Sequence, residues 1–300
     1  MLVRAFVPAH ITAFFVPRFH HDPLLAGSLG AGINLSKGTN VFVSVETGAL
    51  ERHIHVAFNG EPVKREEAII SYSVADEIVP PYFEGEVEVW QYFDFPNGYG
   101  FGNSAGGALG TALALSYSFG GTWLKAGQVA HKHEILNKGG LGDVVAQLAG
   151  GIEVRIKAGG PGHGVVDNLF FEEYRVVVVP LGRLSTREVL DGSVIEAIER
   201  EGKNALERLL SDPRPERMMI LARNFAERTG LLTGELLEVA RELDKVLPVP
   251  SSMIMLGRGL FGLLRKDDVG KVRDVLSELE LPYDVVDVHE GKPVVGRWVG

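Results

Sequence analysis

Hydrophobic and polar residues alternate along the first part of the chain as β-strands require. Ile54, Val56 and Phe58 would share one face of a strand over 53–59, and Asn59-Gly60 after them is typical of a hairpin turn. The same alternation predicts strands over 2–15 and 40–46 and within 82–93, a loop over 17–32 and a short helix over 66–76. These elements lead into a glycine-rich stretch that begins at residue 96.

Helices separated by glycines follow that stretch. A buried helix is predicted over 104–119, a second over 123–137 and a short third over 144–148, and the first two end at Gly120-Gly121 and Gly139-Gly140. The segment 152–157 then alternates as a strand, on which Glu153, Arg155 and Lys157 would share a polar face.

The segment 159–164 contains four glycines and a proline, and it is the strongest candidate for a domain boundary. We therefore expect an N-terminal domain over 1–162 and a C-terminal domain over 163–300. In the second half, Ser185 and Glu188 have the spacing of a capping box before a helix. Helices are predicted over 189–200, 204–210, 214–229, 234–246 and 267–279, and strands over 174–180, 253–256, 260–264, 283–288 and 294–298, the last two around a turn at 290–292. This mixture predicts an α+β domain with helices on one face of a small sheet.

Composition narrows the class of protein. Three hundred residues favour two packed units, and the net charge of −9 argues against non-specific nucleic-acid binding, which needs a basic surface. Cysteine is absent, so a disulfide framework and a thiolate metal site are excluded, and a cytoplasmic location is expected. Pro8 and His10 interrupt the apolar N-terminus, which argues against a signal peptide, and eight glycines crowd the uncharged segment 95–124, which argues against a membrane helix.

The glycine-rich stretch from Pro96 to Gly107 has the composition of a phosphate-binding loop. It lies between a predicted strand and a predicted helix, where unpaired backbone N–H groups and the helix dipole favour an anion. A Gly-Lys pair of the P-loop type is absent. The pattern G-x-G-x-x-G also fails, because Asn103 or Ala105 stands where the third glycine is needed. A tight strand-to-helix connection without a ligand is the alternative.

Three side chains near this stretch suit phosphoryl transfer, which needs a triphosphate cradle, Mg²⁺ and a group that orients the attacking oxygen. Ser104 stands where the loop becomes a helix, and its alternative role is an N-cap. Glu134 follows on the next helix, and its alternative is a surface glutamate. Asp143 begins the third helix after four residues that include three glycines, and it could be the base for a substrate hydroxyl or only an N-cap.

The stretch resembles the second motif of the GHMP kinases (galactokinase, homoserine kinase, mevalonate kinase and phosphomevalonate kinase), P-x-G-x-G-L-G-S-S-A. The resemblance implies an ATP site and assigns Mg²⁺ to Ser104 and Glu134 and catalysis to Asp143. The nucleotide would contact Pro96, Gly98, Gly100, Gly102, Asn103, Ser104, Ala105 and Gly106. Segment 255–261 resembles the third motif. Segment 7–10 resembles the first, with His10 at the position of the family's lysine.

The resemblance covers nearly the whole chain and implies an α+β, two-domain fold. Its N-terminal domain would be like domain 2 of ribosomal protein S5, its C-terminal domain ferredoxin-like, and the site would lie between them. Segments 8–12, 27–35 and 140–144 are most similar to the archaeal branch that phosphorylates pantoate. The residues expected to bind that acid are Ser28, His131, Arg155 and Thr186.

Alternatives for these four are an ion pair for Arg155, a core-edge histidine for His131, and loop or cap roles for Ser28 and Thr186. Another acceptor (shikimate, homoserine or mevalonate) and a nucleotide-binding sensor without turnover are alternative functions. The expected partners are small molecules, with neither nucleic acid nor membrane, and a homodimer is expected.

Overall fold

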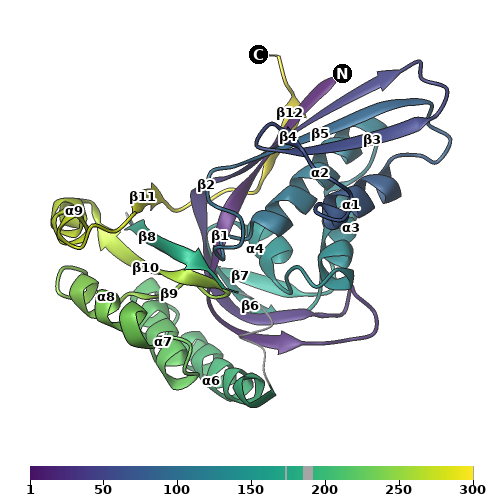
Figure 1. The fold of residues 1–300 in the computed structure, drawn as a ribbon. Helices are drawn as coiled ribbons and strands as arrows, with labels where there is room; N and C mark the ends of the chain where they lie inside the picture. The colour runs from purple at the N-terminus through teal and green to yellow at the C-terminus, as the bar shows by residue number, and fades with distance from the viewer. Residues whose placement is uncertain (173, 185–191, 300) are drawn as a thin grey trace.

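The computed structural model describes residues 1–172, 174–184 and 192–299, and it has two sheets (Figure 1). The larger sheet has eight strands, and the smaller has four in the order β11-β8-β10-β9. Helices and strands are mixed in both parts, so the α+β prediction is confirmed. Across the described ranges, no helix combines the length and the apolar character needed to cross a membrane.

Two long antiparallel strands, β1 (Leu2–Arg18) and β2 (Gly27–Thr47), form the centre of the larger sheet. One end of β2 pairs with β5 (Gly85–Phe93), which pairs in parallel with β3 (Arg52–Phe58), and β3 forms a hairpin with β4 (Glu61–Pro62). The other end of β2 pairs with β6 (Ile152–Lys157), which pairs with β7 (Val165–Leu169). The strand at 53–59 and its hairpin turn are confirmed.

The loop predicted over 17–32 is wrong at both ends, because β1 continues to Arg18 and β2 begins at Gly27. Small residues made this segment look like a loop, but they are small because buried groups lie against them. A Cβ on Gly30 would clash with the carbonyl oxygen of Phe14, and one on Gly32 would clash with Nε2 of His10. Gly30 therefore makes room for the backbone of β1, and Gly32 makes room for the ring of His10.

Four helices accompany the larger sheet: α1 (Ile69–Ile78), α2 (Asn103–Phe119), α3 (Trp123–Leu136) and α4 (Asp143–Ala149). They confirm the helices predicted over 66–76, 104–119, 123–137 and 144–148. Helix α2 is buried over most of its length, with Ser104 and Tyr117 exposed near its two ends, and Gly110 lets its backbone approach the side chain of Val41 on β2. Burial of this apolar surface fixes the start of α2, and so the glycine loop before it, against the sheet.

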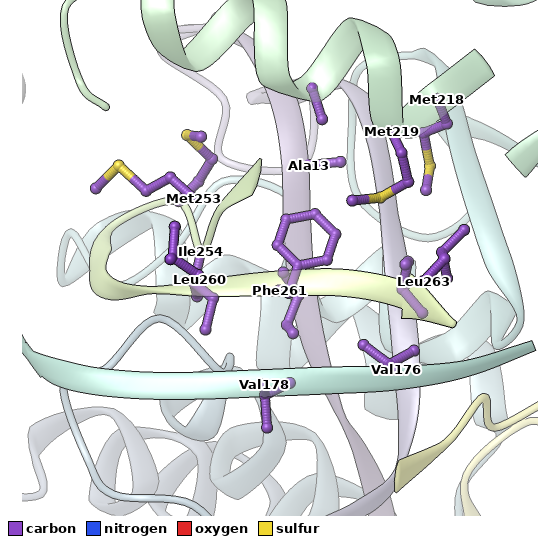
Figure 2. Close-up of a cluster of buried hydrophobic side chains, with 14 of the residues drawn as sticks. Ala13, Val176, Val178, Met218, Met219, Met253, Ile254, Leu260, Phe261 and Leu263 are labelled. Atoms are coloured by element: carbon purple, nitrogen blue, oxygen red, sulfur yellow. The ribbon is translucent and has the colours of Figure 1, made fainter. Parts of the chain in front are cut away.

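The smaller sheet contains β8 (Tyr174–Arg183), β9 (Ser252–Met253), β10 (Gly257–Arg265) and β11 (Asp284–Asp287). Its helices are α6 (Gly192–Ser211), α7 (Pro215–Arg228), α8 (Gly234–Asp244) and α9 (Val269–Glu278), with a 3₁₀ turn at Lys266–Asp268 before α9. Figure 2 shows their core, in which Phe261 of β10 lies near Met219 of α7 and both are fully buried.

A single helix, α6, replaces the two helices predicted over 189–200 and 204–210. Gly202 suggested a break between them. It lies inside the helix instead, where a Cβ would clash with the carbonyl oxygen of Phe15 on β1. The glycine serves a close approach of α6 to β1, which joins the two parts of the molecule.

Two strands from the second half of the chain belong to the larger sheet. β7 pairs with β6, and β12 (Val294–Arg297) pairs with β1. The strands predicted over 283–288 and 294–298 form, but β11 pairs with β8, so they do not form a hairpin. The domain boundary between residues 162 and 163 stays a prediction. The capping box at 185–188 lies outside the described residues.

Candidate active site

The glycine loop before α2 is held in a conformation that needs glycine. Gly98, Gly100 and Gly102 have φ angles of 84°, 82° and 67°, which side chains with a Cβ rarely adopt. The loop also packs on the other sheet, since a Cβ on Gly100 would lie 2.7 Å from the carbonyl oxygen of Met255. A Cβ on Gly257 would clash with the carbonyl oxygen of Tyr99. The segments that resemble the second and third motifs are therefore in contact.

Side chains hold the loop from behind and leave the start of α2 open. Nδ2 of Asn103 donates to the carbonyl oxygen of Phe95 (2.8 Å) and to Oδ1 of Asn97 (2.7 Å), and Nε2 of Gln147 donates to the carbonyl oxygen of Gly102 (3.0 Å). The N-cap is Gly102, and no side chain caps the helix. Its first N–H groups are free for an anionic ligand. Ser104 is not the N-cap.

Ser104 and Glu134 meet beside the loop. Oγ of Ser104 donates to Oε1 of Glu134 at 2.5 Å. Glu134 is only 2% exposed, so the alternative of a surface glutamate is wrong. Burial raises the pKa of its carboxyl to about 8, and the charge of Asp143 adds to this rise, while the hydrogen bond from Ser104 opposes it. A carboxylate buried without a cation is under-compensated, which is what a metal ligand in a metal-free protein would show.

Asp143 is the first residue of α4, after Gly142 as the N-cap, and its side chain remains 24% exposed. Its Oδ1 lies 2.8 Å from Nδ1 of His10. Burial works against ionisation, but the hydrogen bond and charge of His10 and the charge of Arg155 outweigh it and lower the pKa of Asp143. Asp143 is therefore ionised at neutral pH, and one of its oxygens is engaged by a neighbour.

Two cavities adjoin at Glu134 and Asp143, which line both. The first, of about 400 Å³, is lined by the glycine loop and by residues of β3, α1 and β5. The second, of about 990 Å³, is lined by Phe15, Ser28 and Leu141 together with the 137–143 loop. Two ligands bound in these cavities would meet at the two carboxylates.

Ser28 and Arg155 come together beside Gly142; Ser28 and Gly142 line the second cavity, whereas Arg155 is not part of its lining. A Cβ on Gly142 would clash with Oγ of Ser28 and would lie 3.0 Å from Nε of Arg155. Arg155 is 1% exposed, and its Nη1 donates to Oε1 of Glu153 at 2.5 Å. The ion pair weighed for Arg155 therefore exists. Its Nε has no hydrogen-bond partner within the described part of the chain.

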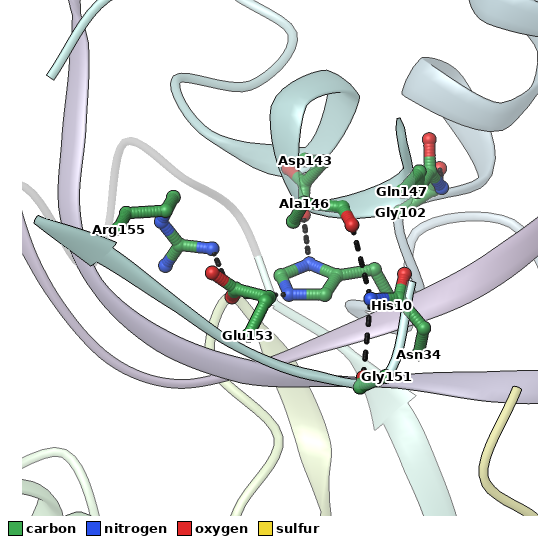
Figure 3. A network of polar contacts seen from close by, with 9 residues as sticks. All are labelled: His10, Asn34, Gly102, Asp143, Ala146, Gln147, Gly151, Glu153 and Arg155. Atoms are coloured by element: carbon green, nitrogen blue, oxygen red, sulfur yellow. Dashed lines mark hydrogen bonds and ion pairs between the residues drawn. The ribbon is translucent and has the colours of Figure 1, made fainter. Parts of the chain in front are cut away.

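The polar face expected on strand 152–157 is buried at Glu153, which is 0% exposed, and at Arg155, whereas Lys157 is exposed. The free-energy cost of burying the charges of Glu153 and Arg155 is offset by their ion pair and by His10, whose Nε2 lies 3.0 Å from Oε1 of Glu153. Figure 3 shows the resulting row from Asp143 through His10 and Glu153 to Arg155. Charged residues two apart on a strand normally indicate a solvated face, so the sequence alone did not predict this buried row of charges.

His131 does not line the second cavity. His131 is 1% exposed, and its Nε2 lies 3.0 Å from the carbonyl oxygen of Ala26. Burial lowers the pKa of His131, so the ring is neutral and its N–H donates to that oxygen. It holds the segment that leads to Ser28. Thr186 lies outside the described residues.

The residues present fit a magnesium ion. The described residues contain no group of three or more His, Asp or Glu arranged around a common metal position. Mg²⁺ on a nucleotide usually takes only one or two carboxylates, with phosphates and waters as its other ligands. The under-compensated carboxylate of Glu134 and the hydroxyl of Ser104 are oxygen donors of this kind, beside a loop suited to phosphates.

Comparisons with known proteins agree with this site. The model of the GHMP kinases N terminal domain matches residues 71–151, which contain the glycine loop, Glu134 and Asp143. A pantoate kinase of Thermococcus kodakarensis is 74% identical over 100% of both chains, and one of Methanospirillum hungatei is 31% identical over 87% of both.

Solved structures give the same result at the level of the fold. A protein described as a phosphotransferase related to the CoA biosynthesis pathway is 73% identical, with a TM-score of 0.97 over 100% of both chains. A homoserine kinase from Cytophaga hutchinsonii is 16% identical, with a TM-score of 0.70 over 98% of this chain and 97% of that one.

Proposed function

This chain belongs to the pantoate kinase family of the GHMP kinases, and we propose on that premise that it phosphorylates the primary hydroxyl of pantoate with ATP. The products are 4-phosphopantoate and ADP, and the reaction serves coenzyme A biosynthesis. The observation that carries this proposal is the position of Glu134 and Asp143 on the wall shared by two cavities. One cavity adjoins a phosphate-type loop, and the other is lined by Ser28 and Gly142, beside which a buried arginine lies.

The nucleotide binds in the first cavity with its phosphates at the start of α2. The positive φ angles of Gly98, Gly100 and Gly102 bring backbone N–H groups close to the phosphates, and the dipole of α2 favours their charge. Ser104 and Glu134 would hold Mg²⁺, and the ion would supply positive charge against the negative charge of the transferring phosphoryl group. Asn103 contributes by fixing the loop through its side chain.

Asp143 accepts the proton of the acceptor hydroxyl. As the acceptor oxygen bonds to the γ-phosphorus, the bond from that phosphorus to the β–γ bridging oxygen breaks and ADP leaves. The proton passes to Oδ2, the oxygen of Asp143 that His10 does not hold. The lowered pKa of Asp143 keeps it ionised and able to orient the hydroxyl at neutral pH.

The second cavity supplies contacts for a hydroxy acid. Nε of Arg155 is a buried donor without a partner in the described residues, and a substrate carboxylate would satisfy it. Ser28 lies beside it and contacts a hydroxyl of the acceptor. His131 supports this site through the segment at Ala26, and Thr186 is proposed to contact the acceptor from the other domain. We also propose a homodimer in the cytoplasm, where ATP is supplied.

The test is ADP release by the purified protein with Mg-ATP and five acceptors: pantoate, shikimate, homoserine, mevalonate and pantothenate. Asp143→Asn is compared with Asp212→Asn, a matched change at an exposed carboxylate that pairs with Arg214. Turnover with pantoate alone, lost in the first variant and kept in the second, is the expected result. Turnover with another acceptor alone would overturn the substrate. ATP binding without any turnover would favour a sensor.

A further inference from the structure

His10 is completely buried between two carboxylates that come from different elements. Its Nδ1 lies 2.8 Å from Oδ1 of Asp143 on α4, and its Nε2 lies 3.0 Å from Oε1 of Glu153 on β6 (Figure 3). A neutral imidazole has only one N–H, so it can donate to only one of these oxygens. Burial lowers the pKa of His10, but the two hydrogen bonds and the two negative charges outweigh it and raise the pKa. The ring is therefore an imidazolium that donates to both.

The ring has no room to turn away from these partners. A Cβ on Gly32 of β2 would clash with its Nε2, so the glycine lets the ring lie close to that strand. The backbone N–H of His10 donates to the carbonyl oxygen of Phe101 at 3.0 Å, which ties its strand to the glycine loop. His10 is thus fixed relative to both the phosphate loop and Asp143.

We propose that His10 and Glu153 are positioning residues for phosphoryl transfer, and that Glu153 holds the His10 imidazolium so that it fixes Oδ1 of Asp143 and leaves Oδ2 for the acceptor hydroxyl. The proposal rests on the function proposed above, in which Asp143 accepts the acceptor's proton. It assigns a task to two buried residues that contact neither proposed ligand.

The charges along the row alternate in sign. Oε1 of Glu153 lies between His10 and Nη1 of Arg155, which is 2.5 Å away, and Arg155 lies beside Gly142 and Ser28, which line the acceptor cavity. Asp143 on α4 and Glu153 and Arg155 on β6 are the charged groups of the row, while β2 places the uncharged residues Gly32 and Asn34 near His10. Glu153 therefore joins the proposed carboxylate binder to the group that orients the base.

The test compares His10→Gln, His10→Lys and Glu153→Gln. Glutamine keeps one hydrogen bond to Asp143 but carries no charge, whereas lysine restores a cation. We expect kcat to fall about 10- to 100-fold in His10→Gln and Glu153→Gln, since losing a base altogether costs about 10²- to 10⁴-fold. The KM for ATP should change less than twofold, because neither residue lines the nucleotide cavity. His10→Lys should recover part of the lost kcat.

Asn34→Ala is the control for a loss of structure without a loss of charge. Asn34 is fully buried opposite His10 on β2, and its Nδ2 donates to the carbonyl oxygens of Ala146 (3.0 Å) and Gly151 (3.3 Å), so it braces α4 and hydrogen-bonds to these carbonyls rather than to the His10 ring. This variant should lower the unfolding temperature while kcat per folded molecule stays close to that of the unchanged protein. The same correction for folded protein applies to the three test variants.

A second measurement does not depend on turnover. In protein labelled with ¹⁵N-histidine, the ring signals of His10, identified by their loss in His10→Gln, should be those of an imidazolium at neutral pH and become neutral in Glu153→Gln. A neutral His10 in the unchanged protein, or equal kcat for the glutamine and lysine variants, would overturn the positioning role. Failure of pantoate as acceptor with an imidazolium present would refute the proposed substrate and leave this arrangement standing.

Discussion

Replacing Glu134 by glutamine is expected to remove a pH dependence from the stability of the metal-free protein. The folded state keeps this carboxyl protonated up to a pKa of about 8, whereas the usual value is 4.5. Between these two values the folded state binds more protons than the unfolded state, so stability falls as pH rises through the window. Glutamine has a similar shape to the protonated acid and does not titrate.

The magnitude follows from the width of the window. Each pH unit between the two pKa values costs about 1.4 kcal/mol of unfolding free energy. The free energy of unfolding at about pH 7 is therefore about 3 kcal/mol lower than at about pH 4.5, because the carboxyl ionises in the unfolded chain but not in the folded one. Because Glu134 is almost fully buried, solvent screens little of this effect.

The assay is guanidinium-induced unfolding of both proteins at several values between about pH 5 and pH 8, with EDTA present. The glutamine variant should be nearly equal to the unchanged protein at the acid end and more stable by about 3 kcal/mol near neutrality. If the difference between the two proteins is the same at every pH, Glu134 does not hold a proton in the folded state, and the reasoning fails. Mg-ATP should stabilise the unchanged protein and have less effect on the variant.

Four further predictions concern single positions. Asp143→Asn should lower kcat at least 100-fold with little change in the KM for ATP, which initial rates at saturating ATP would check. Gly102→Ala should strain the loop by about 1–2 kcal/mol, because alanine is unfavourable at φ 67°, and should therefore weaken ATP binding. Calorimetric titration with ATP tests this, and an unchanged affinity would contradict it. Gly142→Ala should raise the KM of the acceptor but not of ATP, since its Cβ would displace the hydroxyl of Ser28. Equal effects on both KM values would indicate a general disruption of the fold. Gly202→Ala should destabilise the protein by about 1–3 kcal/mol through a clash with β1, and thermal unfolding without a shift would disprove that contact.

Local patterns were enough to predict most elements. The alternation at Ile54, Val56 and Phe58 gave β3, and the uncharged run after the glycine loop gave α2, because each pattern depends on neighbours within a few residues. The glycines themselves indicated an anion site, since positive φ angles and free helix N–H groups are local properties. The order of Ser104, Glu134 and Asp143 then pointed to phosphoryl transfer.

Patterns that depend on distant partners were misread. Gly30 and Gly32 looked like loop residues, but they are the glycines of a central strand that make room for His10 and Arg155. Gly202 looked like a helix end, but it lies where α6 meets β1. In each case the glycine is needed because a residue distant in the sequence packs against it, and a single sequence does not show which residue that is.

The sequence by itself determined the α+β class, the phosphate-type loop and the chemical types that serve it, because these follow from local spacing and side-chain chemistry. Only the tertiary structure decided that Glu153 and Arg155 face inward and that His10 joins Glu153 to Asp143. The side of a strand that is buried depends on what packs against it. The pairing of β6 with β2 placed these charges inside, where each one is stable only because another lies beside it.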